Sequence, residues 1–200
     1  MIDTWFPTTI FRKDKFLEND ENIKVYERIK KLNGVVFDGG KGWLSPVKNS
    51  FGSYNCSNDK ELNFLHEKVS RYVNDFSKAF GCVLKAVCEN SWFNYYEKGD
   101  YQEFHVHPMS HFSVVYIVKG CKESSPLIFA SPYLNDMFSF PVEKPSEISF
   151  ETVEYEATDN TIIIFRSNVP HMVPKNKSQE RITMSFNYKL EEKDETSRRY

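Results

Sequence analysis

From Val83 onward the sequence consists of short segments rich in β-branched and aromatic residues, separated by glycine, proline, asparagine and aspartate. Segments of this composition and length are typical of β-strands. The predicted strands are 84–89, 91–96, 102–107, 113–118, 127–130, 147–155, 161–165 and 182–190. A run of short strands behind a helical N-terminal third predicts a mainly β fold, a jelly-roll sandwich with helices packed on one outer face.

The first part of the chain predicts an edge strand and a short helix. Residues 1–11 mix aromatic and β-branched side chains around Pro7, which suits a short edge strand. Beyond them, apolar residues three apart predict an amphipathic helix that ends near Asn33 and Gly34. These apolar residues are Ile23, Tyr26 and Ile29.

A second, longer helix is predicted to end at Gly81. Asn58 and Glu61 resemble a capping box at its start. Apolar residues recur at three- and four-residue steps, namely Leu62, Leu65, Val69, Tyr72, Phe76 and Phe80. This spacing places them on one face, which must pack on an apolar surface. His66 lies at the edge of that face and is interpreted as a boundary or surface residue.

Length and charge limit the classes of protein to consider. With 200 residues, 40% of them hydrophobic, we expect one domain over 1–190, with its jelly-roll core from about 83 and a flexible charged tail at 191–200. The net charge is −2 and basic residues are interspersed with acidic ones, so the sequence shows no basic patch that would bind nucleic acid or an anionic membrane. No apolar run approaches the roughly 20 residues of a membrane span.

Cysteine usage points to a reducing compartment. The four cysteines show no C-x-x-C spacing, and the chain has no basic-then-apolar signal segment at its N-terminus. We therefore expect a cytoplasmic protein whose cysteines are packing residues. The sequence leaves open whether the chain forms a homodimer.

Three histidines form a candidate metal site. Side chains at i and i+2 of an extended strand point to the same face, so His105 and His107 can converge on one ion. Pro108 ends the ladder just after them, and a third imidazole, His171, follows the apolar strand 161–165. Two histidines of this spacing can also be ordinary polar residues at a rim. The third histidine makes a metal site the favoured interpretation.

Arg181 lies ten residues beyond His171. If 173–180 forms a hairpin turn, the returning strand brings Arg181 back beside the metal, where its guanidinium can bind a carboxylate in bidentate fashion. Thr183, two residues further and on the same face, can add a hydroxyl hydrogen bond. An isolated arginine more often forms a surface ion pair, but the register with His171 favours an anion site.

Together these elements resemble the iron(II)- and 2-oxoglutarate-dependent dioxygenase superfamily. Within it they are most similar to a small bacterial and phage group related to prolyl 4-hydroxylases. The resemblance covers most of the chain and is carried by Trp92-Phe-Asn94, by Tyr96-x-x-Gly99-x-x-Gln102-x-x-His105-x-His107-Pro-x-Ser110, and by His171-x9-Arg181-Ile-Thr183-x-Ser-Phe-Asn187. The joint spacing is much more specific than any one piece.

The resemblance implies a double-stranded β-helix that holds iron(II) at one mouth. His105 and His171 would occupy the two histidine positions of the metal site. His107 falls where the superfamily usually has aspartate or glutamate, so this site would carry one less negative charge. No catalytic residue is implied beyond these metal ligands.

The resemblance also implies the cosubstrates and the reaction. Arg181 and Thr183 would hold the far carboxylate of 2-oxoglutarate, and Gln102, Tyr116 and Tyr96 would line the cosubstrate pocket. With O2, the implied reaction is hydroxylation of proline or a peptidyl prolyl residue, with release of succinate and CO2. The substrate is then a small molecule or a peptide, without a nucleic-acid or membrane partner.

Two alternatives stay open on the sequence. The run Gly99-x5-His105-x-His107 also matches the start of the first cupin motif, and His111 stands where a cupin normally has glutamate. A cupin-type metalloenzyme would place His111 on the metal and leave Arg181 without a role. In a non-catalytic jelly-roll binding module, the histidines would hold a structural zinc ion and the aromatic loop or lid at 131–146 would contact a partner.

Overall fold

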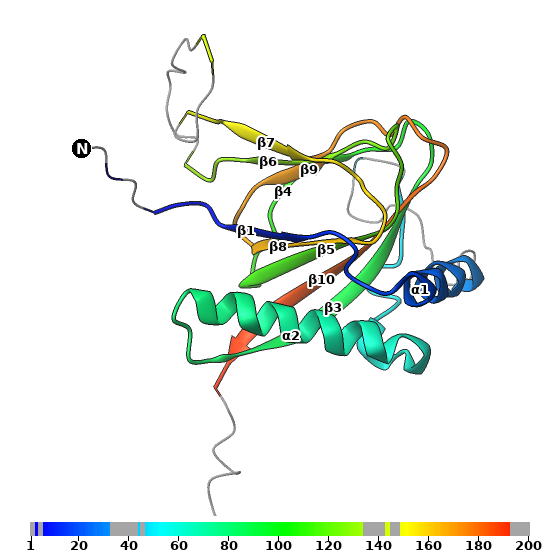
Figure 1. The fold of residues 1–200 in the computed structure, drawn as a ribbon, viewed down its shortest axis with the longest axis horizontal. Helices are drawn as coiled ribbons and strands as arrows, with labels where there is room; N and C mark the ends of the chain where they lie inside the picture. The colour runs from blue at the N-terminus through cyan, green and yellow to red at the C-terminus, as the bar shows by residue number, and fades with distance from the viewer. Residues whose placement is uncertain are drawn as a thin grey trace, which may run out of the picture.

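The computed structural model describes residues 3, 6–32, 44, 47–133, 143–144 and 149–192. These residues form two antiparallel sheets stacked face to face, with two helices on the outer face of the larger sheet (Figure 1). The predicted mainly β jelly roll with helices on one outer face is confirmed. The predicted loop at 131–146 and the tail at 191–200 lie largely outside the described residues.

The larger sheet has the strand order β1-β8-β5-β10-β3-β2 and the smaller one the order β4-β9-β6-β7. Every pairing is antiparallel. The strands of the larger sheet are β1 Ile10–Lys13, β2 Lys48–Asn49, β3 Lys85–Tyr96, β5 Phe112–Lys119, β8 Thr161–Arg166 and β10 Arg181–Glu191. Those of the smaller sheet are β4 Gln102–His105, β6 Leu127–Ala130, β7 Thr152–Tyr155 and β9 His171–Val173.

Helix α1 spans Asn19–Leu32 and helix α2 spans Asn63–Ala79. The predicted face of α1 was partly wrong, because Ile23 is 55% exposed and Val25 is buried beside Ile29 instead. Gly81, at a φ of +74°, follows the end of α2 as predicted. In the described part of the chain, no helix is long and apolar enough to cross a membrane.

The predicted capping box at the start of the second helix was wrong. Two short 3-10 turns, Cys56–Asn58 and Lys60–Leu62, precede α2. Asn55 caps the first turn and Asp59 caps the second, where its side chain accepts a hydrogen bond from the backbone N–H of Glu61. The capping side chains therefore belong to the two turns that precede the helix. The first residue of α2 has no side-chain capping hydrogen bond.

Several predicted strand limits also change. The segments 84–89 and 91–96 are one strand, β3, because Asn90 pairs with Asn187 of β10 and the ladder continues past it. Strand β4 ends at His105, so His107 lies in the loop that follows. The three residues of β9 were not predicted as a strand, since so short a segment has no detectable alternation.

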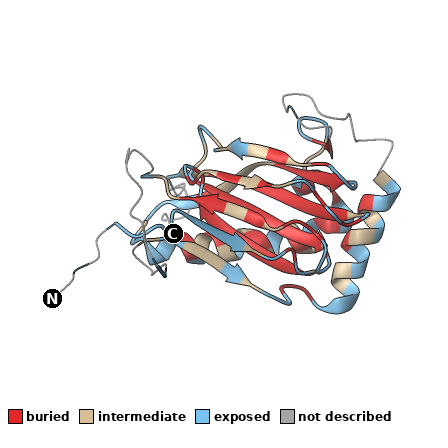
Figure 2. Ribbon diagram, turned by 90° about the horizontal axis from the view of Figure 1, so that it is seen from above, coloured by how far each residue is buried: buried red, intermediate tan, exposed pale blue. Residues whose placement is uncertain are grey.

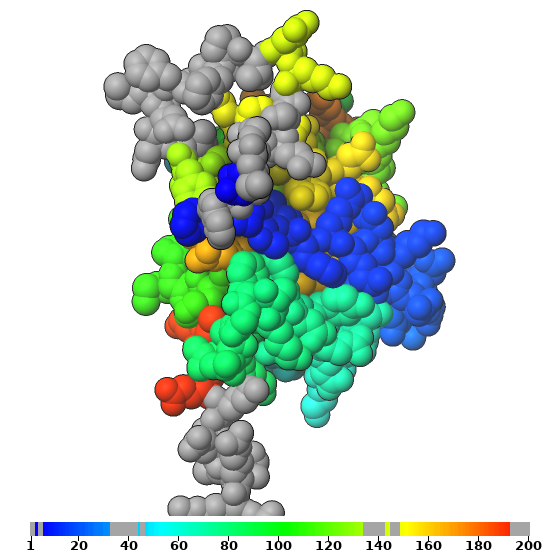
Figure 3. Space-filling model, turned by 60° about the vertical axis from the view of Figure 1, so that its left-hand side comes forward, coloured from blue at the N-terminus to red at the C-terminus, as the bar shows by residue number. Residues whose placement is uncertain are grey.

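The larger sheet separates two hydrophobic clusters. One lies between this sheet and the helices, and the other lies between the two sheets. Figure 2 shows the buried residues concentrated in the strands, while the helices expose their outer sides. On the face shown in Figure 3, the N-terminal segment (blue) runs as a band between α2 (green to teal) and the segment around residues 150–160 (yellow). This band includes β1, which closes the edge of the larger sheet by pairing with β8.

Candidate metal centre

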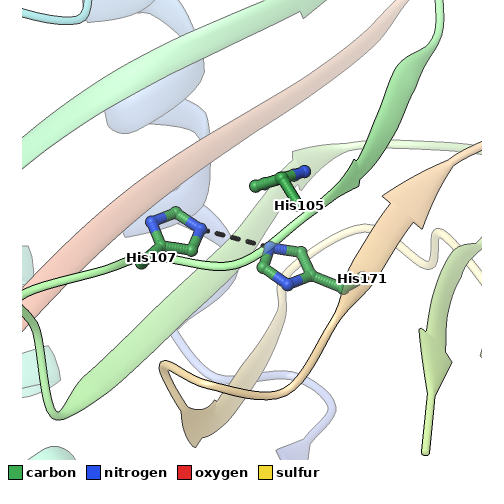
Figure 4. Close-up of side chains that lie close together, drawn as sticks. All are labelled: His105, His107 and His171. Atoms are coloured by element: carbon green, nitrogen blue, oxygen red, sulfur yellow. Dashed lines mark hydrogen bonds between the residues drawn. The ribbon is translucent and has the colours of Figure 1, made fainter. Parts of the chain in front are cut away.

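The three predicted ligand histidines lie together at one end of the smaller sheet (Figure 4). His105 on β4 and His171 on β9 are cross-strand partners, and their ring centroids are 4.2 Å apart. The loop after β4 brings His107 alongside, with its Nε2 atom 3.2 Å from Nε2 of His171. One nitrogen from each ring lies within 4.8 Å of the others, which is close enough for a single metal ion.

Backbone carbonyl groups orient two of the rings. Nδ1 of His105 donates a hydrogen bond to the carbonyl oxygen of Glu103 at 2.8 Å, and Nδ1 of His171 donates to that of Val169 at 3.0 Å. Because a carbonyl oxygen can only accept, each Nδ1 carries the proton. Nε2 then presents its lone pair to the centre, as in most histidine metal sites.

The surroundings keep all three rings neutral. Burial, together with the neighbouring His105, lowers the pKa of His107 to about 3. Burial also lowers the pKa of His105. Burial, followed by the two neighbouring rings, holds the pKa of His171 well below its usual range. Neutral imidazole is the form that binds a metal, so no proton has to leave these rings at neutral pH.

Arg181 begins β10 and is 0% exposed. Its Nε donates to the carbonyl oxygen of Ser125 at 3.1 Å, and its guanidinium carbon lies 4.7 Å from the ring centroid of Tyr96. Nη1 and Nη2 have no hydrogen-bond partner among the described residues. Burial lowers the pKa of this guanidinium, whereas Tyr96 raises it. A buried cation with two unsatisfied nitrogens calls for an anion.

A polar wall joins Arg181 to the histidines. One pocket is lined by the three imidazoles and by Arg181, Thr183, Gln102 and Tyr96, together with Trp92, Asn94, Val115, Leu127, Val173 and Ser185. The Tyr96 hydroxyl donates to Oε1 of Gln102 at 2.9 Å, and Nδ2 of Asn94 donates to the Thr183 hydroxyl at 3.3 Å. The pocket is closed down to about 10 Å³, room for about one water molecule, so a larger ligand must push its walls apart.

The structure does not place Tyr116 in this pocket. Alternation along β5 directs Val115 and Ile117 towards the smaller sheet, so Tyr116 points to the helices. Its hydroxyl donates to Oδ1 of Asn22 at 2.6 Å and lies 3.0 Å from Oδ1 of Asn160. The prediction that Tyr116 contacts the cosubstrate is therefore corrected: this side chain packs α1 against the sheet.

His111 lies away from the three histidines. Its Nδ1 accepts a hydrogen bond from the backbone N–H of Leu190 at 3.3 Å, and its own backbone N–H donates to the carbonyl oxygen of Tyr188 at 2.8 Å. In the described part of the chain the potential metal ligands group as His105, His107 and His171 alone. The four-nitrogen site of the cupin alternative does not form.

Asn176 holds the pocket together, although the sequence assigned it no role. Its Nδ2 donates to the carbonyl oxygens of Glu97 at 3.2 Å and Ser178 at 3.0 Å, and its Oδ1 accepts from the backbone N–H of Ser125 at 3.3 Å. Ser125 in turn holds Nε of Arg181. The only available signal was an asparagine in the polar turn between His171 and Arg181.

The residues present fit iron(II) and a dicarboxylate. Imidazole nitrogen suits iron as well as zinc and copper, so the three rings do not by themselves select one metal. The unsatisfied guanidinium of Arg181 argues against a purely structural zinc site, because such a site gives no reason for a buried cation beside the metal. Thr183 lines the same pocket as Arg181, and its hydrogen bond to the same anion stays a prediction.

Comparison with known proteins agrees with this chemistry. Residues 90–187 match the family model described as "Putative 2OG-Fe(II) oxygenase". Among solved structures, a prolyl-4-hydroxylase from Pseudomonas putida is similar, with 12% identity, a TM-score of 0.67, and coverage of 92% of this chain and 94% of the other. No curated protein sequence matches the chain.

Two further solved structures have a similar fold but are named for different activities. A prolyl hydroxylase from Trichoplax adhaerens, solved with a fragment of hypoxia inducible factor, has 13% identity and a TM-score of 0.67, and the match covers 90% of this chain and 82% of the other. The alpha ketoglutarate dependent epimerase SnoN, from nogalamycin biosynthesis, has 12% identity and a TM-score of 0.67, with coverage of 91% and 78%. Likeness at this identity establishes the fold alone.

Proposed function

Because the chain belongs, through residues 90–187, to the iron(II)- and 2-oxoglutarate-dependent oxygenases, we propose that it hydroxylates a prolyl residue, free or within a peptide. The family match confirms the cofactors predicted from the sequence, which are iron(II) and 2-oxoglutarate with O2. The observation that carries the proposal is the buried Arg181, whose two unsatisfied nitrogens share a pocket with three neutral imidazoles.

In this proposal, His105, His107 and His171 hold iron(II) through their Nε2 atoms. Arg181 and Thr183 bind the far carboxylate of 2-oxoglutarate, and Gln102 and Tyr96 line its path. The iron and cosubstrate supply the oxidising chemistry: one oxygen atom of O2 enters a substrate C–H bond, the other enters succinate, and CO2 leaves.

The chain contributes orientation and the exclusion of water. Arg181 meets its carboxylate in a site with no solvent exposure, where a charge-assisted hydrogen bond is much stronger than in water. The carbonyl groups of Glu103 and Val169 fix two rings before the metal arrives, so little order has to be gained on binding. Asn94 holds the Thr183 hydroxyl in place from the neighbouring strand.

His107 gives the proposed centre an unusual charge. Three neutral imidazoles leave the full +2 charge of iron(II), whereas a carboxylate ligand would reduce it by one. The dianion of 2-oxoglutarate can offset that charge together with the charge of Arg181. A His107→Asp variant would add a negative charge beside the incoming dianion, so we expect weaker binding of 2-oxoglutarate with metal binding retained.

The choice of a prolyl substrate rests on the sequence resemblance and on the two similar prolyl hydroxylase structures. The test is succinate formation from 2-oxoglutarate, with iron(II) and O2, in the presence of proline, proline-containing peptides and other amino acids. A product heavier than the substrate by one oxygen atom indicates hydroxylation. Succinate formed, in the presence of a reductant, with a product of unchanged mass but inverted configuration would instead indicate an epimerisation.

Two histidine variants make the test specific. His171→Ala removes a proposed ligand, and we expect it to abolish iron binding and succinate formation. His111→Ala changes a histidine that lies away from the centre, so it should keep both. If iron-dependent consumption of 2-oxoglutarate is absent across the substrates, or if both variants lose it equally, the proposed function is wrong.

A further inference from the structure

The metal centre also borders a second, open groove on the surface. This groove has a volume of about 340 Å³ and is lined chiefly by Phe51, Trp92, Val106, His107, Met109 and Asn187. We propose that it binds an uncharged residue within a peptide and discriminates against a free amino acid. The inference rests on the proposed function and narrows its substrate to an amide-flanked one.

The groove and the closed pocket adjoin at two of the histidines. Trp92, His105 and His107 line both cavities. Arg181 and Thr183 line only the closed pocket, and Phe51 and Met109 line only the open groove. If the dicarboxylate occupies the closed pocket, the groove is the side from which a substrate reaches the metal.

The walls of the groove are largely apolar and open to solvent. Phe51 is 54% exposed, and its ring meets that of buried Trp92 edge-on, with centroids 5.0 Å apart at 86°. Met109 is 82% exposed and is held at a φ of +72°, which a residue with a side chain rarely adopts. Apolar walls of this extent suit a compact aliphatic side chain or ring.

The charged group of the groove is already neutralised. Glu89, the acidic residue among the described lining residues, pairs with Lys189 and accepts a hydrogen bond from the Ser110 hydroxyl at 3.1 Å. A free amino acid would bring an ammonium and a carboxylate, and each needs a partner when water is removed. The described lining offers no spare charged side chain for either of them.

The polar end of the groove suits an amide instead. Nδ2 of Asn187 donates to Oδ1 of Asn90 at 3.1 Å, and its Oδ1 accepts from the Ser113 hydroxyl at 2.9 Å, so both ends of that side chain are engaged. Among the described residues Nδ2 of Asn90, which also lines the groove, has no hydrogen-bond partner and can donate to a ligand. A peptide carbonyl group accepts such a bond and brings no charge into the groove.

The experiment compares four forms of one residue in the intact protein, loaded with zinc in place of iron and saturated with 2-oxoglutarate so that no turnover occurs. The probes are L-proline, N-acetyl-L-proline, L-prolinamide and N-acetyl-L-prolinamide, with the same series for leucine. Binding is followed by the NMR signal of the Trp92 indole N–H, assigned with a Trp92→Phe variant. We expect an uncharged form to bind about tenfold or more tightly than the free amino acid, because unpaired buried charges are costly.

A matched pair of phenylalanine variants locates the binding. Phe51→Ser removes a groove wall and should weaken binding of the uncharged probe by about tenfold, with zinc and 2-oxoglutarate affinities unchanged. Phe104 is 49% exposed but lines neither cavity, so Phe104→Ser should change none of these affinities.

Equal or tighter binding of the free amino acid, failure of every probe to bind, or an unaffected Phe51→Ser variant would each overturn the inference. The affinity for 2-oxoglutarate is measured in the same samples. Its absence would contradict the proposed function and the inference together, whereas its presence with the wrong probe preference would remove the inference alone.

Discussion

The two faces of strand β10 in the larger sheet differ in chemistry. Along β10, the residues that face the helices are Ile182, Met184, Phe186 and Tyr188, all in the hydrophobic cluster on that side. The residues that alternate with them are Arg181, Thr183, Ser185 and Asn187. Because successive side chains of a strand point to opposite faces, one strand serves both packing and chemistry.

Because the two faces differ in this way, substitutions on one face should affect stability and substitutions on the other should affect ligand binding. On the helix side, side chains are held by apolar burial, which is lost in proportion to the area removed. On the other side, Asn94 joins Thr183 and Ser185 in a hydrogen-bonded network. Among the buried side-chain atoms described in β10, only the terminal nitrogens of Arg181 lack a partner. Substitutions on the two faces should therefore give different phenotypes.

The largest effect is expected from Phe186→Ala, which opens a cavity between the sheet and the helices. We expect the free energy of unfolding to fall by about 3–5 kcal/mol, measured by chemical denaturation. Its neighbour Ser185 faces the pocket and accepts one hydrogen bond from Asn94, so Ser185→Ala should cost about 1 kcal/mol. Equal losses for both variants would show that the two faces are not separable.

Arg181→Met should produce the reverse pattern. We expect the affinity for 2-oxoglutarate to fall by about 30- to 1,000-fold, because a buried charge pair is lost, while zinc or iron affinity stays within about twofold. The free energy of unfolding should not fall, since an uncompensated buried cation is removed. Calorimetric titration measures both ligands, with the exposed Arg166→Met as control. Equal loss of metal and 2-oxoglutarate binding would contradict the assigned role.

Asn176→Ala tests whether the pocket depends on the network behind Arg181. Loss of its hydrogen bonds to Glu97, Ser178 and Ser125 should raise the KM for 2-oxoglutarate about tenfold through a misplaced guanidinium, with a smaller change in kcat. Steady-state kinetics at saturating metal separates the two constants. Asn168→Ala, at an exposed asparagine, is the control and should leave KM unchanged. A fall in kcat alone would rule out a positioning role.

A smaller effect than that of Phe186→Ala is expected at Glu180, which is next to Arg181 but contacts Tyr26 and Lys30 of α1 on the helix side. Burial raises the pKa of this carboxyl, but hydrogen bonds from Lys30, Tyr95 and Tyr26 outweigh burial and lower it. A lowered folded-state pKa stabilises the fold above the unfolded pKa of about 4.3, and this contribution is lost as pH falls through the folded value.

Glu180→Gln should therefore destabilise the protein by about 1–2 kcal/mol at pH 7, and the difference from wild type should shrink on acidification below about pH 4. Denaturation curves collected over this pH range measure it. A difference that stays constant with pH would show that the carboxylate charge is not the cause.

Much of the fold could be predicted because its signals are local. Helix periodicity, β-branched segments and the glycine after α2 each depend on neighbouring residues alone. Two features could not be predicted. Strand β9 has too few residues to show alternation. The turns before α2 are capped by Asn55 and Asp59, and this role depends on the path of the chain before the helix.

The site was predicted where spacing decides position. His105 and His171 are strand partners. The predicted hairpin over 173–180 was wrong, because β9 belongs to the smaller sheet and β10 to the larger one. The connection crosses between the sheets, and Arg181 still lines the same pocket as the histidines. Tyr116 was misplaced because an error of one position in strand parity reverses the face. Asn176 was given no role, because an asparagine in a polar turn does not reveal that it binds backbone groups from distant parts of the chain.

The two sheets divide the proposed ligands between them. The strands β4 and β9 of the smaller sheet carry His105 and His171, whereas β10 of the larger sheet carries Arg181 and Thr183. A diacid that touches both the metal and the guanidinium therefore bridges the gap between the layers. Once the closed pocket has widened to admit the diacid, its contacts with both layers should tie the two sheets together. We expect a higher melting temperature and slower amide exchange in β4 and β9, so the cosubstrate would stabilise the fold before it is consumed.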